Sequence, residues 1–273
     1  MANKSQNQVH AHGDPYDGNV LTAELGPILS GTDALQHLIV KPPLPPADID
    51  TIPPHVRIHY LMDVRDLHVP SLIERQLLQS VDLMVRRGYR QRDPARAATW
   101  ARVSNEPLNG SILLPTAHAA AVEGISGVGK TQGCLRSLYS FPRQIIEHER
   151  FPHVAGSFAQ VVWLSVEVPA SGKSADLARA LMSAWDEATG GARFAEWLGK
   201  DKITNGMRAL DEWRQVAVGH FLGVLHLDEI QNLFTRVRQL RSQVLVFARA
   251  HFQKCHYNSA NCSGVAGFAI PKA

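Results

Sequence analysis

Residues 124–131 read Gly-Ile-Ser-Gly-Val-Gly-Lys-Thr, which fits the pattern G-x-x-x-x-G-K-[ST] at every fixed position. Glycines let a backbone curl around a polyphosphate without side-chain clashes. A helix that starts near Lys130 adds unpaired N–H groups and the positive end of its dipole. We therefore predict a phosphate-binding loop at this point of the chain, formed by Gly124, Ile125, Ser126, Gly127, Val128, Gly129, Lys130 and Thr131.

The last two loop residues and the segment before the loop support this interpretation. The Lys130 ammonium group is expected to reach the β- and γ-phosphates and to act in catalysis, and the Thr131 hydroxyl is expected to ligate Mg²⁺. An apolar run at residues 119–122 precedes the loop, as a strand–loop–helix arrangement requires. The alternative, a chance glycine-rich turn, is disfavoured by this context.

An acidic pair follows further along the chain. Residues 221–229, Phe-Leu-Gly-Val-Leu-His-Leu-Asp-Glu, read as a buried strand that ends in two carboxylates. We predict that Asp228 holds Mg²⁺ through water and that Glu229 polarises the attacking water as a general base. A solvated acidic pair at a strand end is the alternative. The second carboxylate, together with the absence of an Asn-Lys-x-Asp segment, favours ATP over GTP.

Strands and helices are expected to alternate around these two motifs. Residues 161–168 are rich in β-branched side chains and stop at Pro169, so they read as a buried strand, as do residues 221–227. Helices are expected near Lys130, from Ser174 to a closing Gly190, and over residues 203–218. This order predicts an α/β fold with a parallel sheet covered by helices.

The first hundred residues differ from this core in composition. Residues 1–20 are polar and aperiodic, and we expect a disordered N-terminus over 1–40. Six prolines between residues 42 and 54 predict an extended spacer. Ser71 and Glu74 have the spacing of a capping box and open a helix that Gly88 is placed to end. The expected domains are the N-terminus at 1–40, a proline spacer and helical arginine-rich segment at 41–106, a nucleotide-binding core at 107–235 and a basic tail at 236–273.

Composition limits the classes of protein to consider. The chain has 273 residues, a hydrophobic share of 45%, a formal net charge of +3 at pH 7 and three cysteines. This composition supports a packed core, and three cysteines cannot form a disulfide framework, which favours a reducing cytoplasm. Because no stretch approaches the roughly 18 apolar residues of a membrane helix, we expect no membrane partner.

Arginines gather in the segment before the core. Residues 57–102 hold nine arginines against five acidic residues, and Tyr89 lies among four of them. One interpretation is contact with the DNA backbone, with stacking on Tyr89. The other is a solvated helix end whose arginines complement the helix dipole. The candidate DNA contacts are Arg86, Arg87, Arg90 and Arg92.

Several segments taken together resemble the TniB/TnsC-type AAA+ transposition ATPases. The resemblance covers roughly residues 40–235, in order and with plausible spacing. Besides the phosphate loop, the segments are residues 52–60 (Ile-Pro-Pro-His-Val-Arg-Ile-His-Tyr), 88–94 (Gly-Tyr-Arg-Gln-Arg-Asp-Pro), 143–148 (Arg-Gln-Ile-Ile-Glu-His), 162–169 (Val-Trp-Leu-Ser-Val-Glu-Val-Pro) and 228–233 (Asp-Glu-Ile-Gln-Asn-Leu).

The resemblance implies an AAA+ ATPase of a bacterial mobile element that assembles on target DNA with ATP and Mg²⁺. Its partners would be DNA, further copies of itself, a target-selector protein and a transposase, and a neighbouring copy would supply an arginine finger. Two alternatives stay open. One is a helicase-loader-like AAA+ ATPase, and the other is a nucleotide-dependent adaptor with little hydrolysis.

The resemblance ends after Leu233. Residues 230–273 contain no Asp or Glu, and no helical lid or sensor residue is recognisable there, so we expect a missing or incomplete lid, from a truncation or a shifted reading frame. A helix is expected at residues 244–252 and a short strand at 265–270. This strand is the tail segment expected to fill the position between the phosphate-loop strand and the Asp228 strand. Without sensors, we expect weak ATP turnover by the chain alone.

Overall fold

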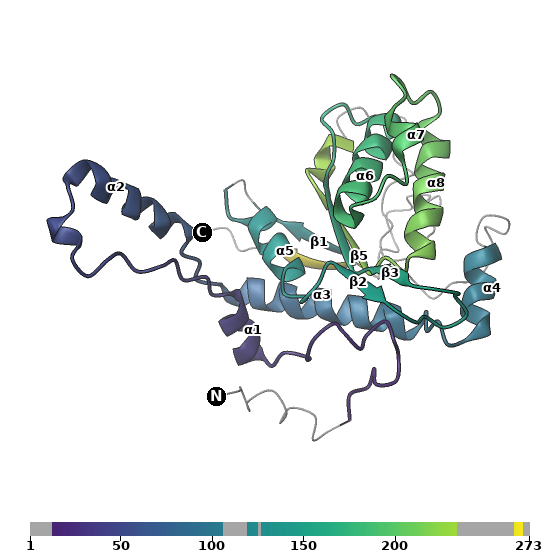
Figure 1. Ribbon diagram of the computed structural model, residues 1–273, viewed down its shortest axis with the longest axis horizontal. Helices are drawn as coiled ribbons and strands as arrows, with labels where there is room; N and C mark the ends of the chain where they lie inside the picture. Colours follow the sequence, from purple (N-terminus) through teal and green to yellow (C-terminus); the bar gives the residue numbers. More distant parts are fainter. Residues whose placement is uncertain (1–12, 106–118, 125–126, 234–264, 270–273) are drawn as a thin grey trace.

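The structure, a computed structural model, describes residues 13–105, 119–124 and 127–233 and the strand at 265–269 (Figure 1). Within these segments the strands form three pairs. Two pairs are parallel: β1 (Ala119–Glu123) with β6 (Val265–Ala269), and β4 (Trp163–Glu167) with β5 (Val224–Asp228). The third pair, β2 (Ile145–His148) with β3 (Phe158–Val161), is antiparallel.

Helices surround these strands. The α-helices are α1 (Gly31–Leu38), α2 (Pro54–Met62), α3 (Leu72–Arg90), α4 (Ala97–Asn105), α5 (Lys130–Leu138), α6 (Ser174–Thr189), α7 (Ala195–Leu198) and α8 (Gly206–Gly219). Short 3₁₀ helices lie at Ile49–Thr51, Asp63–Asp66 and Ile230–Leu233. In the part of the chain that the structure describes, no helix combines the length and the apolar character needed to cross a bilayer.

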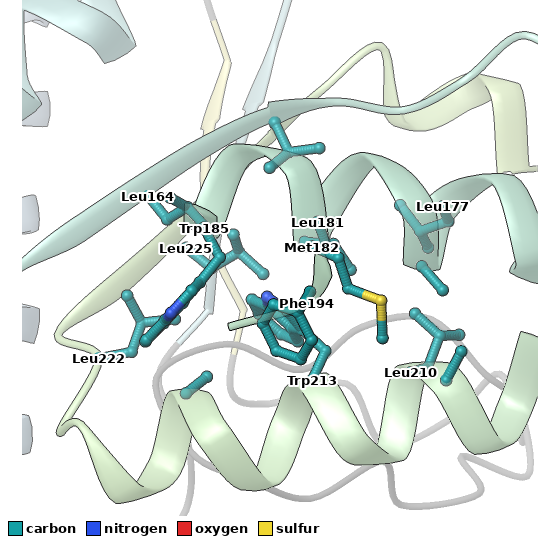
Figure 2. Close-up of a cluster of buried hydrophobic side chains, with 14 of the residues drawn as sticks. Leu164, Leu177, Leu181, Met182, Trp185, Phe194, Leu210, Trp213, Leu222 and Leu225 are labelled. Carbon is teal, nitrogen blue, oxygen red and sulfur yellow. The ribbon is translucent and has the colours of Figure 1, made fainter. Parts of the chain in front are cut away.

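The β4–β5 pair has an apolar core on each of its two faces. Leu164 and Leu225 pack with α6 and α8 in the cluster drawn in Figure 2, where Trp185 and Trp213 meet edge to face at 6.4 Å. Trp163 and Val224 belong to a second cluster with residues of α3 and α5. Successive strand residues point to opposite faces, so this division follows from the register of the pair. The α/β fold expected from the sequence is confirmed.

The N-terminal segment corrects one expectation. Residues 13–40 are ordered, whereas the sequence predicted disorder over 1–40, of which 1–12 lie outside the described residues. Leu21 and Leu25 are buried in the second cluster, and the Asn19 amide donates a hydrogen bond of 2.9 Å to Tyr89 O, near the end of α3. The sequence did not indicate that this segment packs against α3, because most of its side chains are polar and only a few are apolar.

Helix α3 begins where the sequence predicts and ends later. Ser71 accepts a hydrogen bond from the Glu74 backbone and Glu74 accepts one from the Ser71 backbone, so the capping box is confirmed. Gly88, however, does not end the helix, which runs on to Arg90. The additional residues include Tyr89, whose side chain is completely buried. The Tyr89 hydroxyl donates to Val161 O at 3.4 Å. Packing of one aromatic residue therefore overrides the local preference of glycine for a helix end.

The apolar run at 161–168 is divided between two strands rather than forming one. The chain leaves β3 at Val161 and enters β4 at Trp163, and at the junction the Val162 N–H donates to Gln144 O at 2.8 Å. The sheet is therefore not wholly parallel, because β3 pairs antiparallel with β2. Val161, Val162 and Trp163 all favour strands, so only their pairing partners mark the change from β3 to β4.

The observed starts of helices α6 and α8, and the observed end of the proline spacer, differ slightly from the predicted ones. Helix α6 follows Lys173 without a side-chain cap, so Ser174 is its first residue and not its cap, although Gly190 closes it in a left-handed conformation as expected. Helix α8 starts at Gly206 after an Asn205 cap rather than at residue 203. The proline spacer ends earlier than expected, because Pro54 is the first residue of α2. Proline tolerates this position since its missing N–H would be unpaired there.

The tail strand expected at 265–270 is present as β6, and it pairs in parallel with the phosphate-loop strand β1. Among the described strands it is not paired with β5, so the expected bridge between β1 and β5 is only half formed. The helix expected at 244–252 lies outside the described residues.

Replacement of Trp185 by Ala is expected to lower the free energy of unfolding by about 3–5 kcal/mol, because it leaves a cavity in a core that does not collapse around it. Leu83→Ala on α3 is the matched control, since Leu83 is exposed, and should change stability by less than about 0.5 kcal/mol. Urea unfolding followed by fluorescence and circular dichroism measures both. Equal destabilisation of the two variants would contradict the described core.

Candidate functional site

The glycine-rich loop joins β1 to α5 and leaves its backbone open to a ligand. Gly127 and Gly129 have φ angles of 84° and 83°, a left-handed conformation that glycine adopts without strain. A Cβ built on either residue meets no atom within 4 Å, so the backbone conformation rather than packing requires glycine. Gly129 precedes α5 and no side chain caps the helix. The N–H groups of its first turn therefore point toward the loop, as anion binding requires.

Lys130 is the first residue of α5 and bends back over the loop. Its Nζ donates a hydrogen bond of 3.0 Å to the carbonyl oxygen of Gly124, at the other end of the loop. The ammonium group thus lies beside the backbone that is predicted to hold the phosphates. Ile125 and Ser126 lie outside the described residues, so their predicted role stays a prediction.

Thr131 and Asp228 are brought together from distant parts of the sequence. The Thr131 hydroxyl donates a hydrogen bond of 2.8 Å to Asp228 Oδ2. The first turn of α5 and the last residue of β5 therefore meet at one point. The sequence predicted that these two residues share a magnesium ion, and the structure places their oxygens side by side.

These residues fit Mg²⁺ bound together with a nucleotide. Mg²⁺ usually takes one or two protein oxygens and completes its shell with phosphates and water. Thr131 and Asp228 supply a hydroxyl and a carboxylate of this kind. Among the described residues no cluster of three or more His, Cys, Asp or Glu side chains could hold a metal by itself, so the nucleotide phosphates would have to complete the coordination.

Glu229 lies at the turn after β5. Its φ of 52° is a left-handed conformation that is unusual for a residue other than glycine, and its backbone N–H donates to Asp228 Oδ1 at 2.9 Å. The exposed Glu229 carboxylate accepts a hydrogen bond from the Gln231 side chain. The structure therefore places Glu229 next to Asp228 and at the surface, and Gln231 is a partner that the sequence reasoning missed.

A histidine and a serine lie beneath Asp228 on the two neighbouring strands. Ser165 and His226 are register partners, and the Ser165 hydroxyl lies 2.9 Å from His226 Nδ1. Burial lowers the pKa of His226, and the nearby Asp228 opposes part of this shift. His226 is therefore hydrogen-bonded between the two strands, and Ser165 is a partner that only the strand pairing reveals.

Cys134 lies one turn after Thr131 on α5. Burial raises the pKa of its thiol to about 11, and the negative charge of Asp228 contributes further. The thiol is therefore protonated at neutral pH and packs as a small apolar group.

Two of the four predicted DNA contacts, Arg86 and Arg92, are hydrogen-bonded within the protein, and Arg86 is buried. The Arg86 side chain is buried, its Nε pairs with Asp82 Oδ1 at 2.8 Å, and its Nη2 donates to Gly26 O at 2.8 Å. Arg86 thus joins α3 to the N-terminal segment. The prediction that it contacts DNA is wrong, because its hydrogen-bonding groups are engaged inside the protein.

Arg92 and Tyr89 are engaged in the same way. Arg92 Nη2 donates to Leu222 O at 3.0 Å, and its guanidinium group lies 5.3 Å from the centroid of the buried Tyr89 ring. Base stacking on Tyr89 is not compatible with its burial, and two of the Arg92 donors, Nε and Nη2, are already engaged within the protein. Arg87 and Arg90 are exposed, so the predicted contact now rests on these two residues.

Comparison with protein families gives one finding. A family model described as an AAA domain matches residues 115–262, just over half of the chain. The match includes the phosphate loop, Asp228 and Glu229. It also extends past Leu233, so the matched region is longer than the core expected over residues 107–235. Comparison with curated proteins finds no match.

Cys134 is expected to react slowly with thiol reagents in the folded protein. A pKa raised from 9.0 to about 11 lowers the thiolate fraction at pH 8 about a hundredfold. The reaction of a Cys255→Ser/Cys262→Ser variant with a chromogenic disulfide measures this rate, because Cys134 is then the one remaining thiol. The same variant in denaturant is the control. The native rate should keep rising as the pH approaches 11, and a plateau near pH 9 would contradict the placement.

Proposed function

The chain belongs to the AAA domain family, and from this premise we propose that it binds ATP with Mg²⁺ at the glycine-rich loop and hydrolyses it. The observation that carries the proposal is the hydrogen bond of 2.8 Å between Thr131 and Asp228. It joins the start of the phosphate-binding helix to the carboxylate at the end of a neighbouring strand. This pair is the arrangement that a Mg²⁺–triphosphate complex needs.

Each residue of the site has a separate task in this proposal. The loop N–H groups and the Lys130 ammonium group bind the phosphates and neutralise their charge. Thr131 and Asp228 would hold Mg²⁺, which neutralises charge on the phosphate oxygens when bound. Glu229 accepts a proton from the attacking water, and its carboxylate is exposed and next to Asp228.

An adaptor with little hydrolysis is a second candidate, favoured by one specific contact. The Glu229 carboxylate accepts a hydrogen bond from the Gln231 amide, so one of its oxygens is already engaged and less available to a water molecule. In this form the protein binds ATP as a conformational signal while turnover stays weak.

Replacement of Glu229 by Gln is expected to lower phosphate release at least about a hundredfold, because the general base is removed. ATP affinity should change little, since Glu229 does not bind the phosphates in this proposal. Lys130→Ala is the matched variant that should no longer bind ATP. Single-turnover phosphate release and equilibrium binding of Mg²⁺–ATP measure the two effects.

The Gln231→Ala variant distinguishes the two candidates. If Gln231 restrains Glu229, this variant should release phosphate faster than the wild type. Phosphate release that is negligible in both proteins, with ATP binding intact, would favour the adaptor and count against hydrolysis.

We further propose that the protein acts on DNA as a regulator of transposition, in the manner of the TniB/TnsC-type ATPases that its sequence resembles. Support comes from the resemblance over residues 40–235 and from the exposed Arg87 and Arg90 on the last turn of α3. Assembly with ATP on target DNA, and contact with a target selector and a transposase, belong to this proposal. A helicase-loader-like role shares the same site and would differ in the partner.

Replacement of both Arg87 and Arg90 by Ala is expected to weaken binding to duplex DNA to a similar degree for all sequences. The slope of log K against log salt should become shallower by about 0.9 for each phosphate that the protein no longer neutralises. Arg208→Ala, which removes an exposed arginine of α8, is the control. Fluorescence anisotropy at several salt concentrations, with and without ATP, measures these effects. An unchanged slope in the double variant would exclude the arginine segment as the DNA-binding surface.

A further inference from the structure

The turn that follows β5 holds Glu229 in an unfavourable backbone conformation. Its φ of 52° lies in the left-handed region, which residues other than glycine rarely adopt. Such a conformation persists only where the surrounding structure enforces it. Because the backbone of Glu229 sets the direction of its side chain, the contacts that enforce this turn also set where the carboxylate lies.

Asn232 connects this turn to the neighbouring strand. Its side-chain Nδ2 donates a hydrogen bond of 2.8 Å to Val168 O, just past the end of β4. Its backbone N–H donates one of 2.9 Å to Glu229 O. Val168 is fully buried, so water does not reach its carbonyl oxygen to replace the Asn232 amide. Asn232 therefore ties the backbone of Glu229 to the end of β4.

The main chain fixes the beginning of the same turn. The Val168 N–H donates to Asp228 O at 3.0 Å, so the hydrogen bonding between β4 and β5 continues one residue beyond β4. The Glu229 N–H then donates to Asp228 Oδ1 at 2.9 Å. Asp228 is thus the fixed starting point of the turn, and Asn232 holds its other end.

Gly172 packs against Asn232 in the loop after β4. Its N–H donates to Pro169 O at 3.0 Å, so the loop folds back on itself at this point. Gly172 is buried with a φ of 59°, and a Cβ built on it would collide with Asn232 O. The loop and the turn are therefore in direct backbone contact, which a residue with a side chain would not allow.

Gln231 and Asn232 act on different parts of Glu229. The exposed Gln231 side chain donates to the Glu229 carboxylate. Asn232 instead engages the Glu229 backbone, and its own amide group donates to the end of β4. The next residue, Leu233, is buried in the apolar core with α6 and α8 and anchors the segment there.

We propose that Asn232 is a positioning residue for ATP hydrolysis and that Gly172 leaves the space it needs. Asn232 acts through Glu229, because it holds the turn in which the carboxylate stays beside Asp228. No contact between Asn232 and the nucleotide is involved. This inference rests on the proposed function, since a general base is required only if ATP is hydrolysed.

Replacement of Asn232 by Ala is expected to slow single-turnover phosphate release at least about tenfold, because a small displacement of a catalytic group is costly in rate. Affinity for Mg²⁺–ATP should change little, since the phosphate loop is untouched. Gly172→Ala should have the same two effects, through its collision with Asn232 O. Circular dichroism verifies the fold of each variant.

Asn19→Ala is the matched control. The Asn19 amide also donates to a backbone carbonyl, Tyr89 O at 2.9 Å, but it lies in the N-terminal segment on α3. This variant should lose stability and keep its rate of phosphate release. An equal loss of rate in Asn19→Ala and Asn232→Ala would overturn the proposal, because the effect would then be one of general stability.

A double variant separates positioning from a direct role. If Asn232 acts through Glu229, then Asn232→Ala should cause no further loss of rate in a protein that already carries Glu229→Gln. A further slowing as large as the one in the wild-type background would overturn the proposal, since Asn232 would then act independently of Glu229.

Hydrogen exchange of residues 229–233 tests the hold on the turn without any turnover. Backbone amides of this segment should exchange faster in Asn232→Ala and Gly172→Ala than in the wild type, and Asn19→Ala should leave them unchanged. Unchanged exchange in both variants, or faster exchange with normal phosphate release, would overturn the proposal. A wild-type protein that binds ATP and releases no phosphate would instead contradict the proposed hydrolysis, and exchange alone would then decide whether Asn232 holds the turn.

Discussion

The hydrogen bond between Thr131 and Asp228 joins the two halves of the nucleotide site, and its formation depends on the register of the β4–β5 pair. Asp228 faces α5 only because Leu225 and Leu227, at alternate positions of β5, pack toward α6 and α8. A shift by one residue would turn the carboxylate away from the phosphate loop. The apolar core in Figure 2 therefore positions a polar site on the opposite face of the same strand.

The arginines near the end of α3 fall into two groups, one hydrogen-bonded within the protein and one facing solvent. Burial of Tyr89 extends the helix past Gly88 and draws Arg86 and Arg92 into hydrogen bonds with backbone carbonyls. Arginine suits this position because its fork of donors satisfies several carbonyls while its stem packs against apolar groups. The remaining arginines face solvent, so only part of the local positive charge is available to a polyanion.

Some features that involve neighbours along the chain were predicted well, whereas several that depend on long-range packing left no signal in the sequence. The capping box of Ser71 and Glu74 and the left-handed closure at Gly190 involve neighbours along the chain, and both are confirmed. The change of strand partner at Val162 left no local signal, because every neighbour favours a strand. Likewise, a polar N-terminus reads as disordered unless the burial of Leu21 against α3 is known.

The sequence by itself determined the phosphate loop and the acidic pair at residues 228–229, because backbone curvature and metal chemistry restrict which residue types can stand at those spacings. It also determined the alternation of strands and helices. Only the tertiary structure decided that the Thr131 hydroxyl donates a direct hydrogen bond to Asp228, that Gln231 holds Glu229, and which arginines face solvent. Those outcomes depend on contacts between segments far apart in the chain, which exist only once the strands are in register and the helices have packed on them.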